Sequence, residues 1–361
     1  MSFDKHDLST ADITAWLRET DTERLRQLWN EADEVRRSVV GDDVHLRGLV
    51  EVSNHCIRRC AYCGLNATNR ELNRYRMTDD EIMACAREAA EYGYGTVVLQ
   101  AGEDYELTAD WLAGVVRSIK QETELAVTLS MGERTEDELG TWKAAGADRY
   151  LLRFETSDPE LYASIHPPLP GRVSDRFALL HKLRDLGYEI GSGVMLGIPG
   201  QTYQSLAEDI RRFAELDLDM VGVGPFIPHP GTPLGREARE RRRSAGDEQV
   251  PEGEEIAYKV IALTRLVCPQ SNIPSTTALA TLNRSAGRER GLARGANVVM
   301  PNLTPRKYRA LYEIYPSKVC ISETARACHA CMHGRILSLG RSIGTGQGAR
   351  VGFVPHERTG S

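Results

Sequence analysis

Residues 56–64 read CIRRCAYCG and place three thiols, those of Cys56, Cys60 and Cys63, within one short stretch. The Cys-x3-Cys-x2-Cys spacing lets one compact loop turn three sulfurs toward a common centre, as an iron–sulfur cluster requires. Three protein ligands on a cluster of four irons leave one iron open to a substrate or cofactor. A structural zinc site would need four ligands, usually as two separated Cys pairs, and no second pair lies nearby. The loop therefore indicates a 4Fe-4S cluster with a free coordination position.

The loop follows directly on a segment, residues 44–53 (VHLRGLVEVS), that alternates apolar and polar residues as a strand does. After the loop, helical and strand patterns alternate as far as about residue 300. Strands are expected at 44–53, 96–100, 125–130, 149–154, 189–196, 220–226, 272–277 and 297–300. Helices are expected at 78–92, 108–121, 136–145, 174–186, 202–216, 254–267 and 284–294.

This alternation predicts an α/β fold in which a parallel sheet closes as a (β/α)8 TIM-type barrel. The alternative is a three-quarter barrel of six strands, and the two weak last strands decide between them. We favour the full barrel. The expected organisation is an N-terminal helical cap of two short helices (1–40), the barrel (41–310), and a C-terminal segment (311–361) with a second cysteine group and a flexible Gly-rich tail. An Arg/Glu-rich run at 235–253 is expected to be a solvated loop or a short exposed helix.

The composition is that of a globular protein, with 41% hydrophobic and 27% charged residues among 361. A net charge of −6 gives no reason to expect nucleic acid or an anionic membrane as a partner. No apolar run approaches the roughly 20 residues of a membrane span, and Met1–Lys5 lacks the layout of a signal peptide. Six of the eight cysteines fall into two tight groups, which favours metal binding in a reducing cytoplasm over disulfides.

Polar and glycine-rich motifs follow the predicted strands, where a barrel carries its reactive groups. Gly102 permits close backbone approach, and Glu103 can accept a hydrogen bond from an ammonium. Arg153 and Glu155 end the strand at 149–154, either as ligand-binding groups or as part of an ion-pair network at the barrel rim. The glycines of 191–202, Gly197 among them, thin the wall where a bulky ligand must approach.

The cysteine spacing is the signature of radical S-adenosylmethionine (SAM) enzymes, and longer stretches resemble one branch of them, the HydE-type maturases of FeFe-hydrogenase, which are biotin-synthase-like. The resemblance runs from about residue 41 to 339. It rests on CIRRCAYCGL, RYRMT, VLQAGED, GADRYLLR, GIPGQT, DMVGVGPFIPHPGTPL, SNIPSTTAL, and GANVVMPN with the following TPRKY. It implies a complete barrel with the cluster at its top and a large internal cavity.

Carried over residue by residue, the resemblance makes Cys56, Cys60 and Cys63 the ligands of the SAM-binding 4Fe-4S cluster. The SAM contacts would be Tyr62, Glu155 and Arg176, with the Gly102–Glu103 turn and Gly197 nearby. The substrate side would be formed by Arg47, Thr128, Arg153, Met220, Thr276, Thr277, Met300, Tyr312 and Tyr315.

The second group, Cys320-x7-Cys328-x2-Cys331, matches the spacing of an auxiliary cluster found in some members of that family. From chemistry alone it is a zinc site, an iron–sulfur cluster or a set of unmetallated thiols. Because three thiols are one ligand short of a closed site, His329 and His333 are candidates for a fourth. The expectation is an accessory iron–sulfur cluster that the main reaction does not need.

The resemblance also implies an activity. A reduced cluster would cleave SAM to a 5′-deoxyadenosyl radical, which would act on an iron–cysteine complex carrying CO and cyanide during assembly of the 2Fe subcluster. Expected partners are SAM, this small iron–cysteine or amino-acid-like substrate, a ferredoxin or flavodoxin as electron donor, and other hydrogenase maturases. Two departures from the family pattern, Phe154 in place of His and Ala101 in place of Ser, each remove a polar group expected near the cavity.

Three other functions are alternatives to the maturase activity. A methylornithine synthase, a lysine mutase on the same barrel, is the nearest, and the C-terminal cysteines argue against it. A biotin-synthase-like sulfur insertion is further away, because its second cluster is bound inside the barrel. A non-catalytic iron–sulfur scaffold would need no SAM pocket, so Tyr62 and Glu155 weigh against it.

Overall fold

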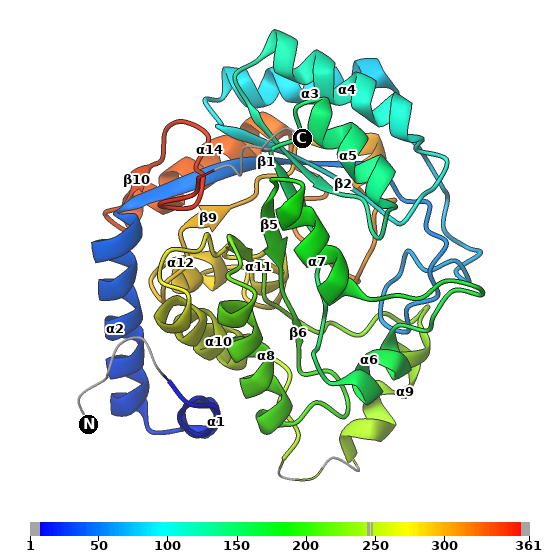
Figure 1. Ribbon diagram of the computed structural model, residues 1–361. Helices are drawn as coiled ribbons and strands as arrows, with labels where there is room; N and C mark the ends of the chain where they lie inside the picture. Colours follow the sequence, from blue (N-terminus) through cyan, green and yellow to red (C-terminus); the bar gives the residue numbers. More distant parts are fainter. Residues whose placement is uncertain (1–7, 244–245, 247, 355–361) are drawn as a thin grey trace.

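The computed structural model describes residues 8–243, 246 and 248–354, and its central feature is a curved parallel sheet (Figure 1). Neighbouring strands pair in the order β1-β2-β3-β4-β5-β7. Their bounds are β1 (Asp43–Ser53), β2 (Thr96–Ala101), β3 (Ala126–Ser130), β4 (Arg149–Leu151), β5 (Glu189–Ser192) and β7 (Met220–Val221). These six strands confirm the predicted parallel α/β sheet.

The sheet closes on itself. β9 (Val298–Val299) pairs with β1 through His45 and Leu46. Single parallel bridges join Met220 of β7 to Asn272, and Pro274 to Val298 of β9. The complete barrel that we favoured is therefore confirmed, but the strand predicted at 272–277 is reduced to these two bridges. Its last residue, Thr277, instead begins helix α11 (Thr277–Leu282).

Two predicted strands are each broken in two. The segment 189–196 contains β5 and β6 (Met195–Leu196), and the segment 220–226 contains β7 and β8 (Gly224–Pro225). β6 pairs with β8 in a small sheet of its own, which follows the C-terminal ends of β5 and β7. The break falls at Gly193, where a Cβ would lie 1.8 Å from the Gly222 carbonyl oxygen. Only glycine allows the two backbones to approach so closely.

Most of the helices that cover the sheet begin at Thr or Asp caps, and the helix that follows Gly253 begins without a side-chain cap. Thr78 and Glu81 form a reciprocal capping box at the start of α3, and Thr202 caps α8. The bounds of the covering helices are α3 (Asp79–Glu91), α4 (Ala109–Glu122), α5 (Glu136–Ala144), α7 (Arg176–Asp185), α8 (Tyr203–Glu215) and α10 (Glu254–Val267). Shorter or additional helices are α6 (Pro159–Ile165), α9 (Pro233–Arg243), α12 (Gly287–Leu292), α13 (Arg306–Arg309) and α14 (Ala325–Ser338).

The two N-terminal helices lie on the outside of the barrel. α1 (Thr10–Arg18) packs against α8, and α2 (Thr22–Val40) packs along α10 (Figure 1). The buried Lys259 of α10 fixes the turn between them, because its Nζ donates to the carbonyl oxygens of Leu17 (3.1 Å) and Glu19 (2.6 Å). The helical cap is thus confirmed as two helices, while the proposed division of the chain into three domains remains a prediction.

The C-terminal tail was predicted to be mobile or draped on the surface, and its first part lies along the outside of the barrel through defined contacts. β10 (Ser342–Ile343) pairs with β1 at Asp43 and Val44. The chain then crosses the barrel floor, where the Gln347 carbonyl accepts hydrogen bonds from Thr96 Oγ1 and Arg149 Nη2, both at 2.9 Å. Buried polar groups at the strand starts need partners, and the tail supplies them. Residues 355–361 lie outside the described residues.

Two further sequence expectations concern surface segments. α9 confirms a short helix at the start of the 235–253 run, although residues 244, 245 and 247 lie outside the described part of the chain. The N-terminal stretch Met1–Lys5 also lies outside it. Over residues that are described, no helix combines the length and apolar character of a membrane span.

Candidate active site

The three clustered cysteines lie in the loop that leaves the C-terminal end of β1. Cys60 is buried, and Cys56 and Cys63 are partly buried. Burial is the main cause that raises the pKa of each thiol. Neighbouring sulfurs further raise the pKa of Cys63 and contribute to that of Cys60, which is about 12. Three thiols near enough to affect one another, in a dry pocket and without a disulfide, fit the donor set of an iron–sulfur cluster.

No group of three His, Cys, Asp or Glu side chains within the described ranges is gathered tightly enough to hold a single metal ion. The thiolates of a cubane cluster bind different irons, so they stand further apart than the ligands of one ion. The cysteine loop is therefore suited to a cluster and not to a zinc ion.

The backbone around the cysteine loop is fixed from two sides. The Ile57 amide donates to the Glu103 carbonyl (3.0 Å), and the Gly64 amide donates to the Ile314 carbonyl (3.0 Å). Two glycines make these contacts close enough: a Cβ on Gly102 would lie 2.2 Å from the His55 carbonyl oxygen, and a Cβ on Gly64 would lie 2.1 Å from that of Glu313. Gly102 therefore serves the cluster loop directly.

Glu103, expected near the SAM amine, is used inside the protein instead. Its Oε1 accepts from Arg58 Nε of the cysteine loop (2.8 Å) and from the Tyr105 hydroxyl (2.8 Å). Its Oε2 accepts from the Glu133 amide (3.1 Å). Arg58 also pairs with the Glu133 carboxylate at 2.8 Å. This buried network braces the cysteine loop against β2 and β3, and neither Gly102 nor Glu103 lines the barrel cavity.

A cavity of about 330 Å³ occupies the inside of the barrel and reaches the cysteine loop at Tyr62. It brings together most of the side chains that the sequence pointed to. The predicted residues that line it are Arg47, Tyr62, Thr128, Arg153, Glu155, Arg176, Met220, Thr276, Thr277, Met300 and Tyr315. They come from all around the barrel, so only closure of the sheet makes them neighbours.

Glu155 lines the cavity beside Arg153, and Arg176 lines the same cavity. Arg153 Nη2 pairs with Glu155 Oε2 at 3.0 Å, and Arg153 Nε has no hydrogen-bond partner among the described residues. Arg176 is already engaged: its Nε donates to Glu133 Oε1 (2.9 Å), and its Nη2 lies 2.7 Å from His166 Nε2. Arg176 thus lines the cavity as a fixed charge, while Arg153 keeps an N–H group for a ligand.

Arg47, in the first half of β1, lines the cavity as a fully buried cation. Its Nη1 contacts Met220 Sδ at 2.8 Å, and its Nη2 donates to the Gly348 carbonyl at 2.9 Å. Burial lowers its pKa to about 9, and the nearby charge of Arg149 adds to the effect. Thr128, on the same wall, has a buried hydroxyl without a hydrogen-bond partner in the described residues. These groups remain ready for a polar or anionic ligand.

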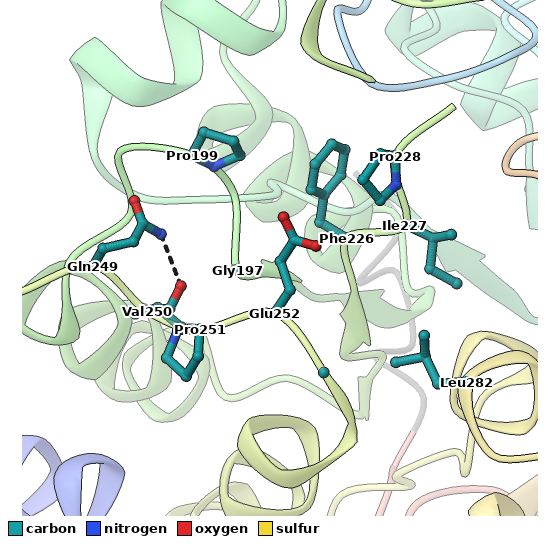
Figure 2. A pocket seen from close by; sticks show the side chains of 11 residues that line it. Gly197, Pro199, Phe226, Ile227, Pro228, Gln249, Val250, Pro251, Glu252 and Leu282 are labelled. Atoms are coloured by element: carbon teal, nitrogen blue, oxygen red, sulfur yellow. Dashed lines mark hydrogen bonds between the residues drawn. The ribbon is translucent and has the colours of Figure 1, made fainter. Parts of the chain in front are cut away.

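Gly197 and Tyr312 do not line the barrel cavity. Gly197 lies in a separate outer pocket, where a Cβ would meet the backbone of Glu252 at 2.9 Å, and it faces Pro199, Phe226 and Glu252 (Figure 2). Tyr312 is buried behind the wall, where its hydroxyl accepts a hydrogen bond from Gln100 Nε2 at 3.2 Å. Gln100 itself lines the cavity, so Tyr312 acts on it from behind.

The two departures from the family pattern differ in their consequences. Phe154 points away from the cavity and packs against Phe177 and Phe213, with ring centroids 5.0 and 5.7 Å away. Our expectation that Phe154 removes a polar group from the cavity was wrong. Ala101 does line the cavity, so the absence of a hydroxyl there bears on the ligand.

Sequence reasoning missed a buried ion pair in the cavity wall. Lys318 Nζ contacts Glu51 Oε1, and the second oxygen, Glu51 Oε2, accepts from Asn302 Nδ2 at 3.1 Å. Both charged residues line the cavity. Glu51 could have been found, because it stands four residues after Arg47 on β1 and alternate residues of a barrel strand face inward. Lys318 carried no such signal, since it lies in an irregular segment.

The second cysteine group lies outside the barrel, beside α14. Cys320, Cys328 and Cys331 line one pocket with Arg288 and Arg335. Arg335 Nε lies 3.3 Å from Cys331 Sγ, and Arg288 Nη1 lies 3.9 Å from Cys320 Sγ. A hydrogen bond from Cys328 and the charge of Arg288 lower the pKa of Cys320 to about 6. This setting favours a thiolate at Cys320, while the same hydrogen bond and burial raise the pKa of Cys328. Three cysteines in one pocket fit the predicted accessory cluster, which remains a proposal.

The candidates for a fourth ligand at this site are not brought to it. His329 stacks on Tyr92, with ring centroids 4.4 Å apart, and its Nδ1 lies 3.2 Å from the Tyr94 hydroxyl. His333 packs beside His329 at 4.2 Å. Neither histidine lines the cysteine pocket. The expectation that one of them completes the site is therefore not supported.

A barrel whose top carries three clustered thiols above an internal polar cavity defines a radical SAM enzyme. The family model of the radical SAM superfamily matches residues 50–213, which include the cysteine loop and Glu155. Such enzymes hold a 4Fe-4S cluster and SAM. In this chain Tyr62, which lies between Cys60 and Cys63, lines the barrel cavity.

The chain belongs to the HydE family of FeFe-hydrogenase maturases. It is 46% identical over 323 residues to the FeFe-hydrogenase maturase subunit HydE of Thermotoga maritima, covering 90% of this chain and 88% of that protein. It is 31% identical over 297 residues to the 3-methylornithine synthase of Methanosarcina acetivorans, covering 81% and 79% of the two chains.

Solved structures agree on the fold. The crystal structure of the methylornithine synthase PylB matches with a TM-score of 0.79 and 25% identity, covering 94% of this chain and 95% of that one. A structure of HydG, a maturase of the FeFe-hydrogenase, matches with a TM-score of 0.73 at 17% identity, covering 92% and 71%. The chain is accordingly a radical SAM hydrogenase maturase of the HydE type, and the mutase reading is not favoured.

Proposed function

We propose that this maturase acts on a small iron–cysteine complex carrying CO and cyanide, as a step toward the 2Fe subcluster of FeFe-hydrogenase. The observation that carries the proposal is the barrel cavity, which the tail contacts at one end and which reaches the cysteine loop at Tyr62. Its lining includes four basic side chains against two acidic ones, together with hydroxyl groups. A compact anionic complex suits such a cavity, because fixed charges in a dry site replace its hydration shell.

In this proposal the residues of the upper cavity hold SAM. Cys56, Cys60 and Cys63 would bind the cluster, which supplies the electron that cleaves SAM to a 5′-deoxyadenosyl radical. The Glu155 carboxylate would accept hydrogen bonds from polar groups of SAM, and Tyr62 would cover its adenine. Arg153, with its one unpartnered N–H group, would pair with a carboxylate. Arg176 would fix the position of Glu133 and His166 behind them.

The middle and lower cavity would hold the substrate. Thr276 and Thr277 would donate to its carboxylate, and Tyr315, Met300 and Met220 would pack against its apolar and sulfur atoms. Thr128 and Arg47 would face its anionic end, since both keep unpartnered donors among the described residues. The protein contributes orientation and exclusion of water, and the tail across the barrel floor serves the second role.

Several partners belong to this proposal. SAM and a reductant follow from the class of enzyme. The proposal adds that the reductant is a ferredoxin or flavodoxin, and that other hydrogenase maturases are partners of this protein. A cytoplasmic location also belongs here, and the eight cysteines, all in the described part of the chain, support it because none forms a disulfide.

The test is an anaerobic assay of SAM cleavage by the reconstituted, reduced protein. We expect 5′-deoxyadenosine to form faster when the iron–cysteine complex made by HydG is added. A Cys60→Ala variant serves as the blank. Cleavage that ignores this complex but responds to lysine would overturn the proposal in favour of a mutase, and loss of cleavage under every condition would leave an iron–sulfur scaffold.

A further inference from the structure

Glu155 adopts a backbone conformation that its side chain disfavours. Its φ is +64°, in the left-handed region, which a non-glycine residue adopts only where the surrounding structure imposes it. The Thr156 amide donates to the Phe154 carbonyl at 2.8 Å, so the chain turns sharply around Glu155. The turn is what directs the Glu155 carboxylate into the cavity. Something must hold it there.

Asp209, in the middle of α8, provides this restraint. Its Oδ1 accepts two hydrogen bonds from Ser157, one from the amide at 2.5 Å and one from the hydroxyl at 2.7 Å. Ser157 stands two residues after Glu155, where the turn ends. The Asp209 side chain is completely buried and does not line the barrel cavity.

The carboxylate of Asp209 is placed at a cost. Its pKa is raised to about 7, mainly by burial, and the charge of Asp158 contributes to this rise. Its Oδ2 has no hydrogen-bond partner of good geometry among the residues that the structure describes, although the Thr156 hydroxyl acts on the carboxylate, and no cation is among the groups that shift its pKa. A buried carboxylate without a counterion lowers stability. What the buried carboxylate provides in return is a fixed position for Ser157, which donates both hydrogen bonds to it.

The same helix also holds the residue before Glu155. Phe154 packs on Phe213, which lies one turn after Asp209 on α8, with ring centroids 5.7 Å apart. Phe154 is thus fixed by an aromatic contact and Ser157 by a carboxylate, both from α8 (Figure 1). Glu155 lies between these two fixed points.

We propose that Asp209 is a positioning residue for SAM: by holding Ser157 it keeps Glu155 in the left-handed turn that presents its carboxylate to the cofactor. This inference rests on the proposed role of Glu155 in binding SAM. Asp209 never meets the ligand, and its effect passes entirely through Glu155.

The experiment is a double-mutant cycle on the reconstituted holoenzyme, with the Kd for SAM and the rate of 5′-deoxyadenosine formation as readouts. The variants are Asp209→Leu, Glu155→Gln and the combination of both. Asp209→Asn is the conservative variant, because an amide oxygen accepts the same hydrogen bonds. Glu208→Gln is the matched control, since it removes a carboxylate at the neighbouring, exposed position of α8. Iron content and thermal unfolding check that each variant folds.

We expect Asp209→Leu to raise the Kd for SAM by about 10- to 100-fold, the range that a displaced binding group produces. Asp209→Asn and Glu208→Gln stay near the wild-type value. Adding Asp209→Leu to Glu155→Gln gives little further loss, because both changes remove one interaction. Additive losses in the folded double variant, or a normal Kd in Asp209→Leu, would overturn the inference. A normal Kd in Glu155→Gln would overturn it too, because Glu155 would then not bind SAM. Cleavage of SAM by the wild-type protein would be untouched by that result, so the proposed function is tested separately.

Discussion

Lys318 reaches from the irregular C-terminal segment into the barrel and pairs with Glu51 of β1, and both side chains are almost completely buried. Lys318 also lines the pocket of the second cysteine group. A single side chain therefore touches both the barrel cavity and the outer cysteine site. The pair joins the first strand of the barrel to the segment that follows its last one.

Replacing Lys318 by Met should destabilise the protein by about 3–5 kcal/mol, because it leaves the buried Glu51 carboxylate without its cation. The double change Glu51→Gln with Lys318→Met should recover a large part of this loss. The measurement is anaerobic thermal unfolding. Lys307→Met is the control: Lys307 pairs with Glu81 on the surface, where solvent screens the attraction and a pair contributes little. Equal shifts in the two single variants would contradict the prediction.

Gly102→Ala should impair assembly of the iron–sulfur cluster. The new Cβ would lie 2.2 Å from the His55 carbonyl oxygen, so the cysteine loop must move away from β2. Overpacking of this kind costs about 1–3 kcal/mol. We expect less iron per chain after reconstitution and a weaker absorption of the cluster. The control is Gly114→Ala, on α4, where a Cβ meets nothing within 4 Å. Wild-type iron content in Gly102→Ala would show that the loop tolerates the displacement.

Gly95→Ala should release the tail from the barrel floor. A Cβ there would lie 1.5 Å from the Gly346 carbonyl oxygen, which belongs to backbone and cannot rotate away. The carbonyls of Gln347 and Gly348 would then lose their contacts with Arg149 and Arg47. Faster cleavage by trypsin after Arg350 is the expected signature.

The matched control for this tail prediction is Gly140→Ala on α5, where a Cβ again meets nothing within 4 Å. An alanine in a helix should leave the protein as stable or more stable, by up to about 1 kcal/mol. Unchanged proteolysis at Arg350 in Gly95→Ala would mean that the tail adapts without leaving the floor.

Asp209 should make the stability of the protein fall as the pH rises from about 4 to about 7. Its pKa is 3.8 as a free group and about 7 in the folded protein, where burial is the main cause. The folded state therefore binds more protons than the unfolded state between these values, and stability is lost as the carboxyl ionises. Its near neighbours are Ser157, Thr156 and Asp158.

Asp209→Asn removes this dependence. The free energy of unfolding of the Asn variant minus that of the wild type should increase between pH 5 and pH 8, by at most about 1.4 kcal/mol per pH unit. The difference between their melting temperatures should increase in the same direction. Glu208→Gln, at the exposed neighbouring position, should show a constant difference over the same range. A constant difference for Asp209→Asn would mean that its carboxyl titrates normally.

The sequence by itself determined the alternation of strands and helices, the helix caps and the cysteine loop. These features depend on neighbours in the chain: Thr78 caps α3 through Glu81, three residues away, and the three cluster thiols share one loop. The sequence also pointed to most residues of the cavity, because they follow motifs at strand ends, although the family resemblance was needed to assign them roles.

Only the tertiary structure decided the rest. Glu103 was expected at SAM, but Arg58 binds it inside the protein, and the Gly346–Gly348 turn was expected in a flexible tail but meets Arg149 and Arg47. Lys318 and Asp209 gave no signal, because each acts on a partner far away in the chain. Charged and polar groups are paired when the barrel closes, and which pairs form depends on distances in space that spacing along the chain does not contain.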